Sequence, residues 1–294
     1  MVVYSRGMKI EYFKEPNIKR LNLVNEGGEK FQGGQVTLVG GSGLFHGAPI
    51  MALKVLSRMV DMVYFACPKD DKGVVERIKA SLGAFIWIPR EDLEEYVNKS
   101  DVVLIGPGMM RNGRARDGVA CDSEGKKTRS LSLSLFEKFP QKKWVIDGGS
   151  LQVLKAEELP KNAVITPNKR EWEMVFGEKL VESQKEVGVQ VKKMALKYGV
   201  TIVMKGEVSV VSDGKSTMMI EGGSEGLTKG GTGDVLAGLI SGLLVNNEKV
   251  LAGAAGNFLV KKASERLEEE RGLMYNAEDL ILEVAILWKE LIDN

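Results

Sequence analysis

The chain has 294 residues, of which 44% are hydrophobic and 28% charged, a balance typical of a globular protein with a sizeable core. Its formal net charge of +1 gives no long-range field that would favour nucleic acid or an anionic membrane. The most apolar stretch, residues 235–245, is shorter than the roughly 20 residues of a membrane span, and the first residues lack the layout of a secretion signal. The two cysteines, Cys67 and Cys121, make no disulfide framework and no zinc site. We therefore expect a cytoplasmic protein without nucleic-acid or membrane partners.

The sequence contains a single histidine, His46. A metal site built from several histidines is therefore excluded, and a Ser-His-Asp triad would have to use His46 as its base. If the protein moves a proton in catalysis, its general base is expected to be a carboxylate.

Short β-rich runs alternate with helical patterns along much of the chain. The expected strands cover residues 35–39, 62–66, 84–88, 102–105, 144–146 and 164–166. Helical patterns lie between several of them, at residues 48–59 and 71–82. This alternation predicts an α/β fold with a parallel sheet covered by helices on both faces.

The pattern changes in the last third of the chain. A helical spacing at residues 187–198 precedes three strands that are separated only by short turns, at 200–204, 208–211 and 217–220. Such a meander predicts a small antiparallel edge on a mixed sheet. Three helices are expected after it, at 231–244, 249–267 and 277–292.

Neither a repeat nor a low-complexity linker divides the chain, so we expect one domain over residues 1–294. The polar, glycine-rich stretch 111–128 is expected to be an exposed insertion.

The strongest local signal is the sequence Gly230-Gly231-Thr232-Gly233-Asp234 at the start of an apolar helical pattern. Its glycines let the backbone N–H groups converge, and the helix dipole adds positive potential, which together predict an anion site. An acid would repel a bound phosphate there, unless its task is to deprotonate a hydroxyl beside the transferred phosphoryl group. The alternative is that Asp234 only caps the helix. The small residues ahead of it favour the catalytic interpretation.

Other polar or glycine-rich turns also follow expected strands. They are Gly40–Gly43, Gly106–Gly108, Asp147–Ser150, Thr166–Glu171 and Lys205–Glu207. Each could be an ordinary turn, and the glycine spacings after the first two strands do not complete a dinucleotide fingerprint. Because the carboxyl ends of parallel strands meet at one edge of a sheet, where such sheets bind ligands, we expect these turns to line one cleft.

The spacing of Asn168 and Glu171 is that of a helix capping box. The same spacing also allows a second interpretation, in which the Glu171 carboxylate orders a magnesium-bound water.

Taken in order, these motifs resemble the ribokinase-like superfamily, and most closely its ADP- or ATP-dependent NAD(P)H-hydrate dehydratases. The resemblance covers about residues 30–294 and is most specific in the segment 230–238. It implies a ribokinase-like three-layer α/β sandwich with a mostly parallel central sheet. Residues 1–30 are left as an N-terminal extension of the single domain.

The resemblance also implies roles for particular residues. Asp234 would face the substrate hydroxyl as the catalytic base, and Ala48, Gly108 and Asn168 would line the same substrate site. The nucleotide would be held by Lys205, Gly206, Glu207, Val208, Ser209, Gly230, Gly231, Thr232 and Gly233. Mg²⁺ would bridge the phosphates of ADP or ATP rather than sit in a protein cage, with Glu171 reaching it through water.

The implied reaction is a metabolite repair. Phosphorylation of the ring hydroxyl of hydrated NADH or NADPH turns a poor leaving group, hydroxide, into a good one, and loss of phosphate then restores the reduced dinucleotide. The sequence does not distinguish ADP from ATP or NADHX from NADPHX, and a homo-oligomer is left open.

This chain departs from the family's pattern at three places. Asn168 stands where the family usually has histidine, Asp147-Gly148-Gly149-Ser150 replaces Asp-Ala-Asp-Ala, and residues 111–128 look inserted. Thr-Pro-Asn is common in sugar and vitamin kinases of the superfamily, so a kinase for a small alcohol such as hydroxyethylthiazole is the second hypothesis. A nucleotide-sensing module without turnover is the third, and the intact Gly-Gly-Thr-Gly-Asp argues against it.

Overall fold

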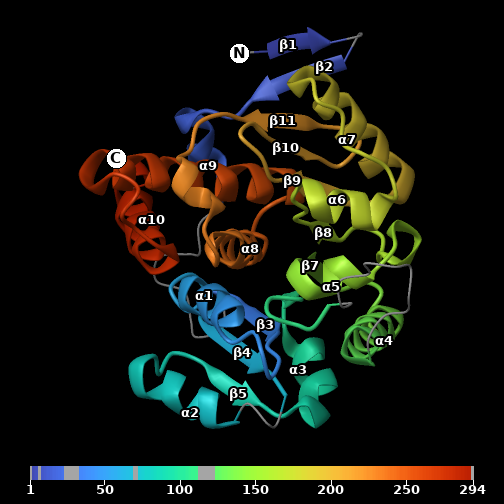
Figure 1. The fold of residues 1–294 in the computed structure, drawn as a ribbon, viewed down its shortest axis with the longest axis vertical. Coiled ribbons are helices and arrows are strands. Elements are labelled where there is room, and N and C mark those ends of the chain that lie inside the picture. The colour runs from blue at the N-terminus through green and yellow to red at the C-terminus, as the bar shows by residue number, and fades with distance from the viewer. Residues whose placement is uncertain (1, 6–7, 23–32, 69–71, 112–122, 293–294) are drawn as a thin grey trace.

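The computed structural model describes residues 2–5, 8–22, 33–68, 72–111 and 123–292. Within them one eleven-stranded sheet runs in the order β1-β2-β11-β10-β9-β8-β7-β6-β3-β4-β5 (Figure 1). The strands from β9 to β5 in this order pair in parallel. They are β9 (Thr201–Met204), β8 (Val164–Ile165), β7 (Lys143–Ile146), β6 (Val102–Ile105), β3 (Gln35–Val39), β4 (Met62–Ala66) and β5 (Ile86–Ile88).

The remaining strands make the sheet mixed. The meander after β9 is antiparallel, as expected, through β10 (Ser209–Ser212) and β11 (Thr217–Ile220). Strand β2 (Met8–Tyr12) then pairs in parallel with β11, and β1 (Val2–Ser5) pairs antiparallel with β2. The expected strand at 84–88 is shorter than predicted and covers Ile86–Ile88 only.

Helices cover both faces of the sheet, which confirms the predicted three-layer sandwich (Figure 1). One face packs against α1 (Gly47–Leu56), α2 (Lys72–Ser81), α8 (Thr232–Leu243), α9 (Lys249–Arg271) and α10 (Ala277–Ile292). The other packs against α3 (Leu93–Lys99), α4 (Ser123–Lys138), α5 (Gly148–Val153), α6 (Lys169–Phe176) and α7 (Gln184–Tyr198).

Two hydrophobic cores result, because successive side chains of a strand point to opposite faces. In β6, Val102 and Leu104 belong to the first core, while Val103 and Ile105 belong to the second. Both faces are covered, so most positions of the parallel strands are apolar on either face, with few polar residues such as the buried Thr37.

The described part of the N-terminal extension is built into this architecture. Besides β1 and β2, a 3-10 helix over Glu15–Arg20 buries Ile18, which is 1% exposed, in the first core beside Phe13 and Leu21. Met8–Tyr12 alternates apolar and polar residues, as a strand does, but its five residues do not indicate which strand it pairs with.

The expectation of an exposed insertion at 111–128 is wrong for its last part. Residues 123–128 form the first turns of α4, and Gly125 and Thr128 are buried there. Alternating serines and leucines in α4 obscure the helical spacing of its apolar side. Residues 112–122 lie outside the described part of the chain.

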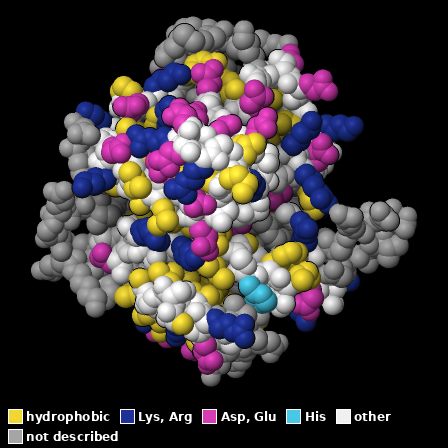
Figure 2. All heavy atoms as spheres, turned by 60° about the vertical axis from the view of Figure 1, so that its left-hand side comes forward, with side chains coloured by type: hydrophobic (Ala, Val, Ile, Leu, Met, Phe, Trp, Pro, Cys, Tyr) yellow, Lys and Arg dark blue, Asp and Glu magenta, His cyan; other side chains and the backbone are white. Residues whose placement is uncertain are grey.

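The surface carries charges of both signs. Figure 2 shows Lys and Arg side chains interspersed with Asp and Glu over one face of the molecule, in keeping with the net charge of +1. Within the described ranges, no helix combines the length and the apolar character that crossing a membrane requires.

Candidate active site

The glycine turn before α8 has the geometry of an anion site. Gly231 is the N-cap of α8 with φ of 95°, a left-handed conformation that favours glycine, and a Cβ there would lie 2.9 Å from Ala277 Cβ. The Thr232 hydroxyl donates to the carbonyls of Leu227 and Lys229, at 2.7 and 2.9 Å, and so fixes the start of the helix. The first backbone N–H groups of α8 and its dipole therefore face the turn.

Asp234 is not the residue that caps α8. The N-cap is Gly231, and Asp234 is the third residue of the helix. The alternative in which Asp234 serves only as the cap is therefore not supported by the structure.

Two cavities lie on either side of this turn. The first, of about 570 Å³, is lined by Thr232 and Gly233 together with the segments 205–207 and 222–225. The second, of about 490 Å³, is lined by Gly230, Gly231 and Asp234, together with residues 44–48. Five consecutive residues thus form the wall between two cavities, with the Asp234 carboxylate on the side of the second.

Close packing of α1 on α8 builds the second cavity. At Gly238 a Cβ would lie 2.8 Å from the carbonyl oxygen of Ala52, so only glycine lets the two helices approach this far. The approach brings the start of α1, with Ala48, to the same cavity as Asp234.

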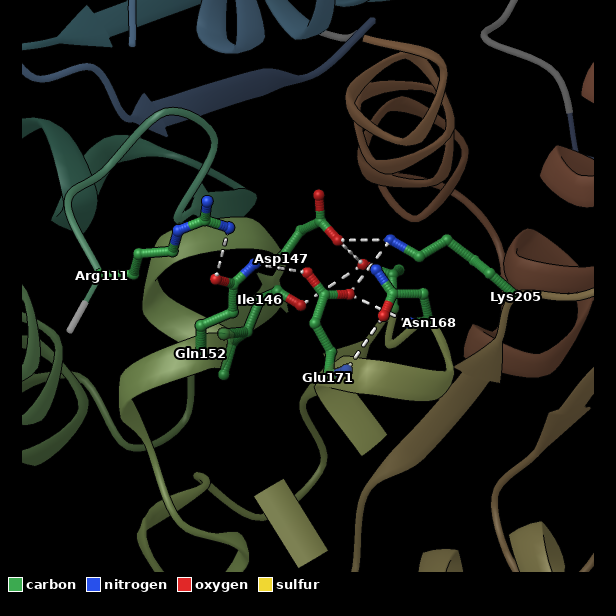
Figure 3. Close-up of polar contacts among 8 residues, drawn as sticks. Arg111, Ile146, Asp147, Gln152, Asn168, Glu171 and Lys205 are labelled. Atoms are coloured by element: carbon green, nitrogen blue, oxygen red, sulfur yellow. Dashed lines mark hydrogen bonds and ion pairs between the residues drawn. The ribbon is translucent and has the colours of Figure 1, made fainter. Parts of the chain in front are cut away.

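A buried charge cluster lies behind the turn (Figure 3). The Lys205 ammonium donates to Asp147 Oδ1 at 2.9 Å and lies 3.6 Å from Glu171 Oε2. The hydroxyl of Thr166 donates to the same Asp147 oxygen at 2.6 Å. Asp147 directly follows β7 and Lys205 directly follows β9, whereas Glu171 lies in the first turn of α6, the helix after β8.

Electrostatics within the cluster set the protonation of Asp234. Burial and the carboxylate of Asp147 raise the pKa of Asp234 to about 7, although the Lys205 ammonium acts to lower it. Burial alone would lower the pKa of Lys205, but the carboxylates of Asp147, Glu171 and Asp234 outweigh it and raise that pKa. Asp234 is therefore a carboxyl group that titrates near neutral pH beside a permanently charged lysine, which suits a general base.

The predicted capping box at the start of α6 is confirmed. Asn168 Oδ1 accepts from the Glu171 backbone N–H, and the Asn168 N–H donates to Glu171 Oε2, both at 2.9 Å. The other oxygen, Glu171 Oε1, accepts from Gln152 Nε2 at 2.9 Å, and Arg111 donates to Gln152 in turn. Both oxygens of Glu171 are thus engaged by the protein (Figure 3).

Glycines bring the remaining strand-end turns together. Gly106 has φ of 120°, and a Cβ on it would overlap the carbonyl oxygen of Asp147. Gly108, with φ of 69°, leaves no room for a Cβ beside Phe45 and Pro49. The turns after β3, β6 and β7 therefore contact one another through their backbones.

The structure distributes the predicted site residues between the two cavities. Lys205, Gly206, Glu207, Ser209, Thr232 and Gly233 line the first cavity, and Ala48, Gly230, Gly231 and Asp234 line the second. Asn168, predicted on the substrate side, lines the first cavity, whereas Val208 and Gly108 line neither. Their roles in binding stay predictions.

Sequence reasoning missed part of the wall of each cavity. In the first, these are Gly222–Ser224 and the α9 residues Asn257 and Lys261; in the second, Phe45, Asn276 and Glu278. Lys261 and Asn257 lie one helical turn apart in the buried part of α9. Their sequence pattern gave no signal beyond two polar residues on a helix.

The comparisons with known proteins agree with this geometry. The family model of NAD(P)H-hydrate dehydratases matches residues 36–285, most of the chain. The chain belongs to the NAD(P)H-hydrate dehydratase family. The matched residues include the strand-end turns that line both cavities and the turn before α8. The match therefore supports the family resemblance that the sequence motifs indicated.

One relative is similar to this chain in sequence, and two solved structures are similar to it in fold. The ADP-dependent (S)-NAD(P)H-hydrate dehydratase of Nitrosopumilus maritimus is 30% identical over 267 residues, which are 88% of this chain and 90% of the relative. A ribokinase-like superfamily protein of Enterococcus faecalis superposes with a TM-score of 0.79 at 20% identity and covers 99% of both chains. The ADP/ATP-dependent NAD(P)H-hydrate dehydratase of Bacillus subtilis, co-crystallised with ATP and Mg²⁺, superposes with a TM-score of 0.77 at 20% identity, over 96% of this chain and 98% of that one. These superpositions confirm the ribokinase-like fold.

Proposed function

We propose that this protein dehydrates hydrated NADH or NADPH at the expense of ADP or ATP. The observation that carries the proposal is the Gly230–Asp234 turn, which forms the wall between two cavities with an acid of raised pKa on one side. The nucleotide occupies the first cavity and the hydrated nicotinamide ring the second. The terminal phosphoryl group then lies at the turn, where the N-terminus of α8 stabilises its charge.

The reaction proceeds in two steps. In the first step, Asp234 takes the proton of the ring hydroxyl, and the hydroxyl oxygen forms a bond to the terminal phosphorus of the nucleotide. The bond between that phosphorus and the rest of the nucleotide breaks. The ring C–O bond then breaks, phosphate leaves with the electron pair, and loss of a proton from the neighbouring ring carbon restores the double bond. AMP or ADP, phosphate and the reduced dinucleotide are the products.

Mg²⁺ is the ion that such phosphates carry, and the donors near the turn are the hard oxygens that it prefers. The described His, Cys, Asp and Glu residues form no cluster that would hold a metal by itself, so the ion would be bound mainly by phosphates and water. Three carboxylates around the single Lys205 ammonium leave negative charge that a cation offsets. Glu171 would reach it through water, and the ion would neutralise charge that develops on the phosphate oxygens.

On the substrate side, Ala48 and Asp234 share the second cavity and would contact the hydrated ring. Gly108 would act by letting the Phe45 backbone approach. Asn168 lines the first cavity beside Lys205, so it would lie on the nucleotide side of the turn. The cytoplasmic location and the single domain stay predictions from the sequence, and the oligomeric state remains open.

Turnover provides the test of this function. The protein is incubated with hydrated NADH or hydrated NADPH and with ADP or ATP, and the absorbance of the reduced nicotinamide is followed. The account predicts nucleotide-dependent return of that absorbance, with release of AMP or ADP matching it in amount. The four combinations also establish the donor and the dinucleotide.

The kinase for a small alcohol is distinguished by its product. A kinase would accumulate a stable phosphate ester from hydroxyethylthiazole or a sugar, whereas the dehydratase releases inorganic phosphate. Family membership favours the dehydratase. A stable ester and no recovery of NADH would reject the proposal.

A further inference from the structure

The first cavity has a buried cation in its wall that the proposed reaction does not use. Lys261 lies in the middle of α9 and is 4% exposed. Burying an ammonium group is costly unless its donors are all paired. The reason for a buried lysine at this position has to come from what its end group contacts.

The ammonium of Lys261 donates to three backbone carbonyls. The acceptors are Gly206 at 3.1 Å, Glu207 at 2.5 Å and Gly222 at 2.7 Å. An ammonium has three N–H donors, so this arrangement uses all of them. Hydrogen bonds from a charged donor are stronger than those between neutral groups, which offsets part of the cost of burial. Burial still lowers the pKa of Lys261, to about 8.

These carbonyls belong to two separate segments in the wall of the first cavity. Gly206 and Glu207 follow β9, whereas Gly222 follows β11, and strand β10 lies between the two in the sheet. Both segments line the cavity. Lys261 therefore joins two loops whose separation sets the width of the cavity.

Neighbouring side chains of α9 hold only one of these loops. The Ser264 hydroxyl accepts from the Ser224 N–H at 3.0 Å, and Glu265 Oε1 accepts from the Gly223 N–H at 2.8 Å. Neither contact reaches the loop after β9. Serine and glutamate on the same helix thus provide matched controls for the lysine.

We propose that Lys261 is a positioning residue that holds the two loops of the nucleotide cavity at the separation needed to bind ADP or ATP. The inference rests on the proposed function, because it takes the first cavity as the nucleotide site. Lys261 touches backbone rather than the reacting atoms, so it affects nucleotide binding and not the chemical step. A site that is held in shape before binding loses less entropy when the ligand enters.

The experiment compares Lys261→Met with Glu265→Gln and Ser264→Ala, using ADP as the probe. Methionine keeps much of the buried stem and removes the charge. We expect Lys261→Met to raise the dissociation constant and KM for ADP about tenfold or more, because three charge-assisted hydrogen bonds are lost, and to change kcat less than about threefold. We expect the controls to change KM less than about threefold, because Ser264→Ala removes and Glu265→Gln weakens a contact to one loop only.

A rescue experiment separates positioning from general stability. Lys261→Ala deletes the side chain beyond Cβ, and n-propylammonium supplies the missing carbons and the cation. The added cation should restore ADP affinity, while n-propanol at the same concentration should not. If Lys261→Met does not fold, Lys261→Gln, which keeps amide donors without the charge, carries the same comparison.

Several results would overturn the inference. These are an unchanged KM for ADP in the Lys261 variants, a loss confined to kcat, equal losses in the Glu265 and Ser264 controls, or equal rescue by n-propanol. Failure of the wild-type protein to bind either ADP or ATP would instead reject the proposed function, and calorimetric titration of the wild type with both nucleotides shows which of the two has failed.

Discussion

At the scale of single residues, the charges around Asp234 do not balance. Asp147, Glu171 and Asp234 face one ammonium, that of Lys205. Burial, and after it the Asp147 carboxylate, raise the pKa of Asp234 to about 7. A general base acts only in its deprotonated form, so the pKa of Asp234 should determine how kcat/KM depends on pH.

We expect kcat/KM for the hydrated dinucleotide to fall as the pH is lowered through about 7, because Asp234 then becomes protonated in the free enzyme. Initial rates between pH 5 and 9 at a fixed nucleotide concentration would measure this acidic limb of the pH–rate profile. Asp147→Asn removes a charge that raises the pKa of Asp234, so the limb should move to lower pH. A limb that stays in place in this variant would contradict the assignment.

At the scale of the element, the turn before α8 contains two adjacent glycines in different situations. Gly231 has a left-handed backbone and lies against Ala277, whereas a Cβ on Gly230 would meet open space. Gly231→Ala should therefore lower the free energy of unfolding by about 1–3 kcal/mol, the usual cost of such a conformation.

Gly230→Ala is the control for that substitution and should change stability by less than about 0.5 kcal/mol. Urea denaturation of the apo protein would measure both. Equal effects of the two substitutions would mean that the turn is not held in the conformation described here.

The strand-end turns were predictable because each carries its own local signal. A glycine, an acid or a lysine directly after an apolar run marks the end of a strand, and parallel topology then places Asp147, Glu171 and Lys205 together. The division into two cavities was not predictable, because it depends on how α1 packs against α8 at Gly238. The role of Lys261 was not predictable either, because its hydrogen-bond partners Gly206 and Glu207 are 55 and 54 positions away in the sequence.

At the scale of the whole molecule, the N-terminal segment belongs to the same core as the C-terminal helices. Phe13 contacts Phe258 of α9 with ring centroids 5.6 Å apart, and Ile18 lies in the first hydrophobic core. The parallel sheet was predictable from its apolar runs, but this segment was not, because β2 pairs with β11 from the other end of the chain and nothing local indicates that pairing.

Ile18→Ala should therefore destabilise the whole protein by about 2–5 kcal/mol, the usual cost of truncating a buried aliphatic side chain. Thermal or urea unfolding followed by circular dichroism would measure it as a single shifted transition. The neighbouring exposed Lys19→Ala should have an effect within about 0.5 kcal/mol. A loss no larger than that of Lys19→Ala would show that the segment lies outside the cooperative core.

The central claim, that Asp234 is the base of a nucleotide-dependent dehydratase, is tested most directly by Asp234→Asn. Asparagine keeps the size of the side chain and removes the proton acceptor, so turnover of hydrated NADH should fall by roughly 10²–10⁴-fold. Binding of ADP should be retained or tighten, because a negative charge near the phosphates is removed. Turnover close to that of the wild type, in a variant that binds ADP normally, would contradict the mechanism.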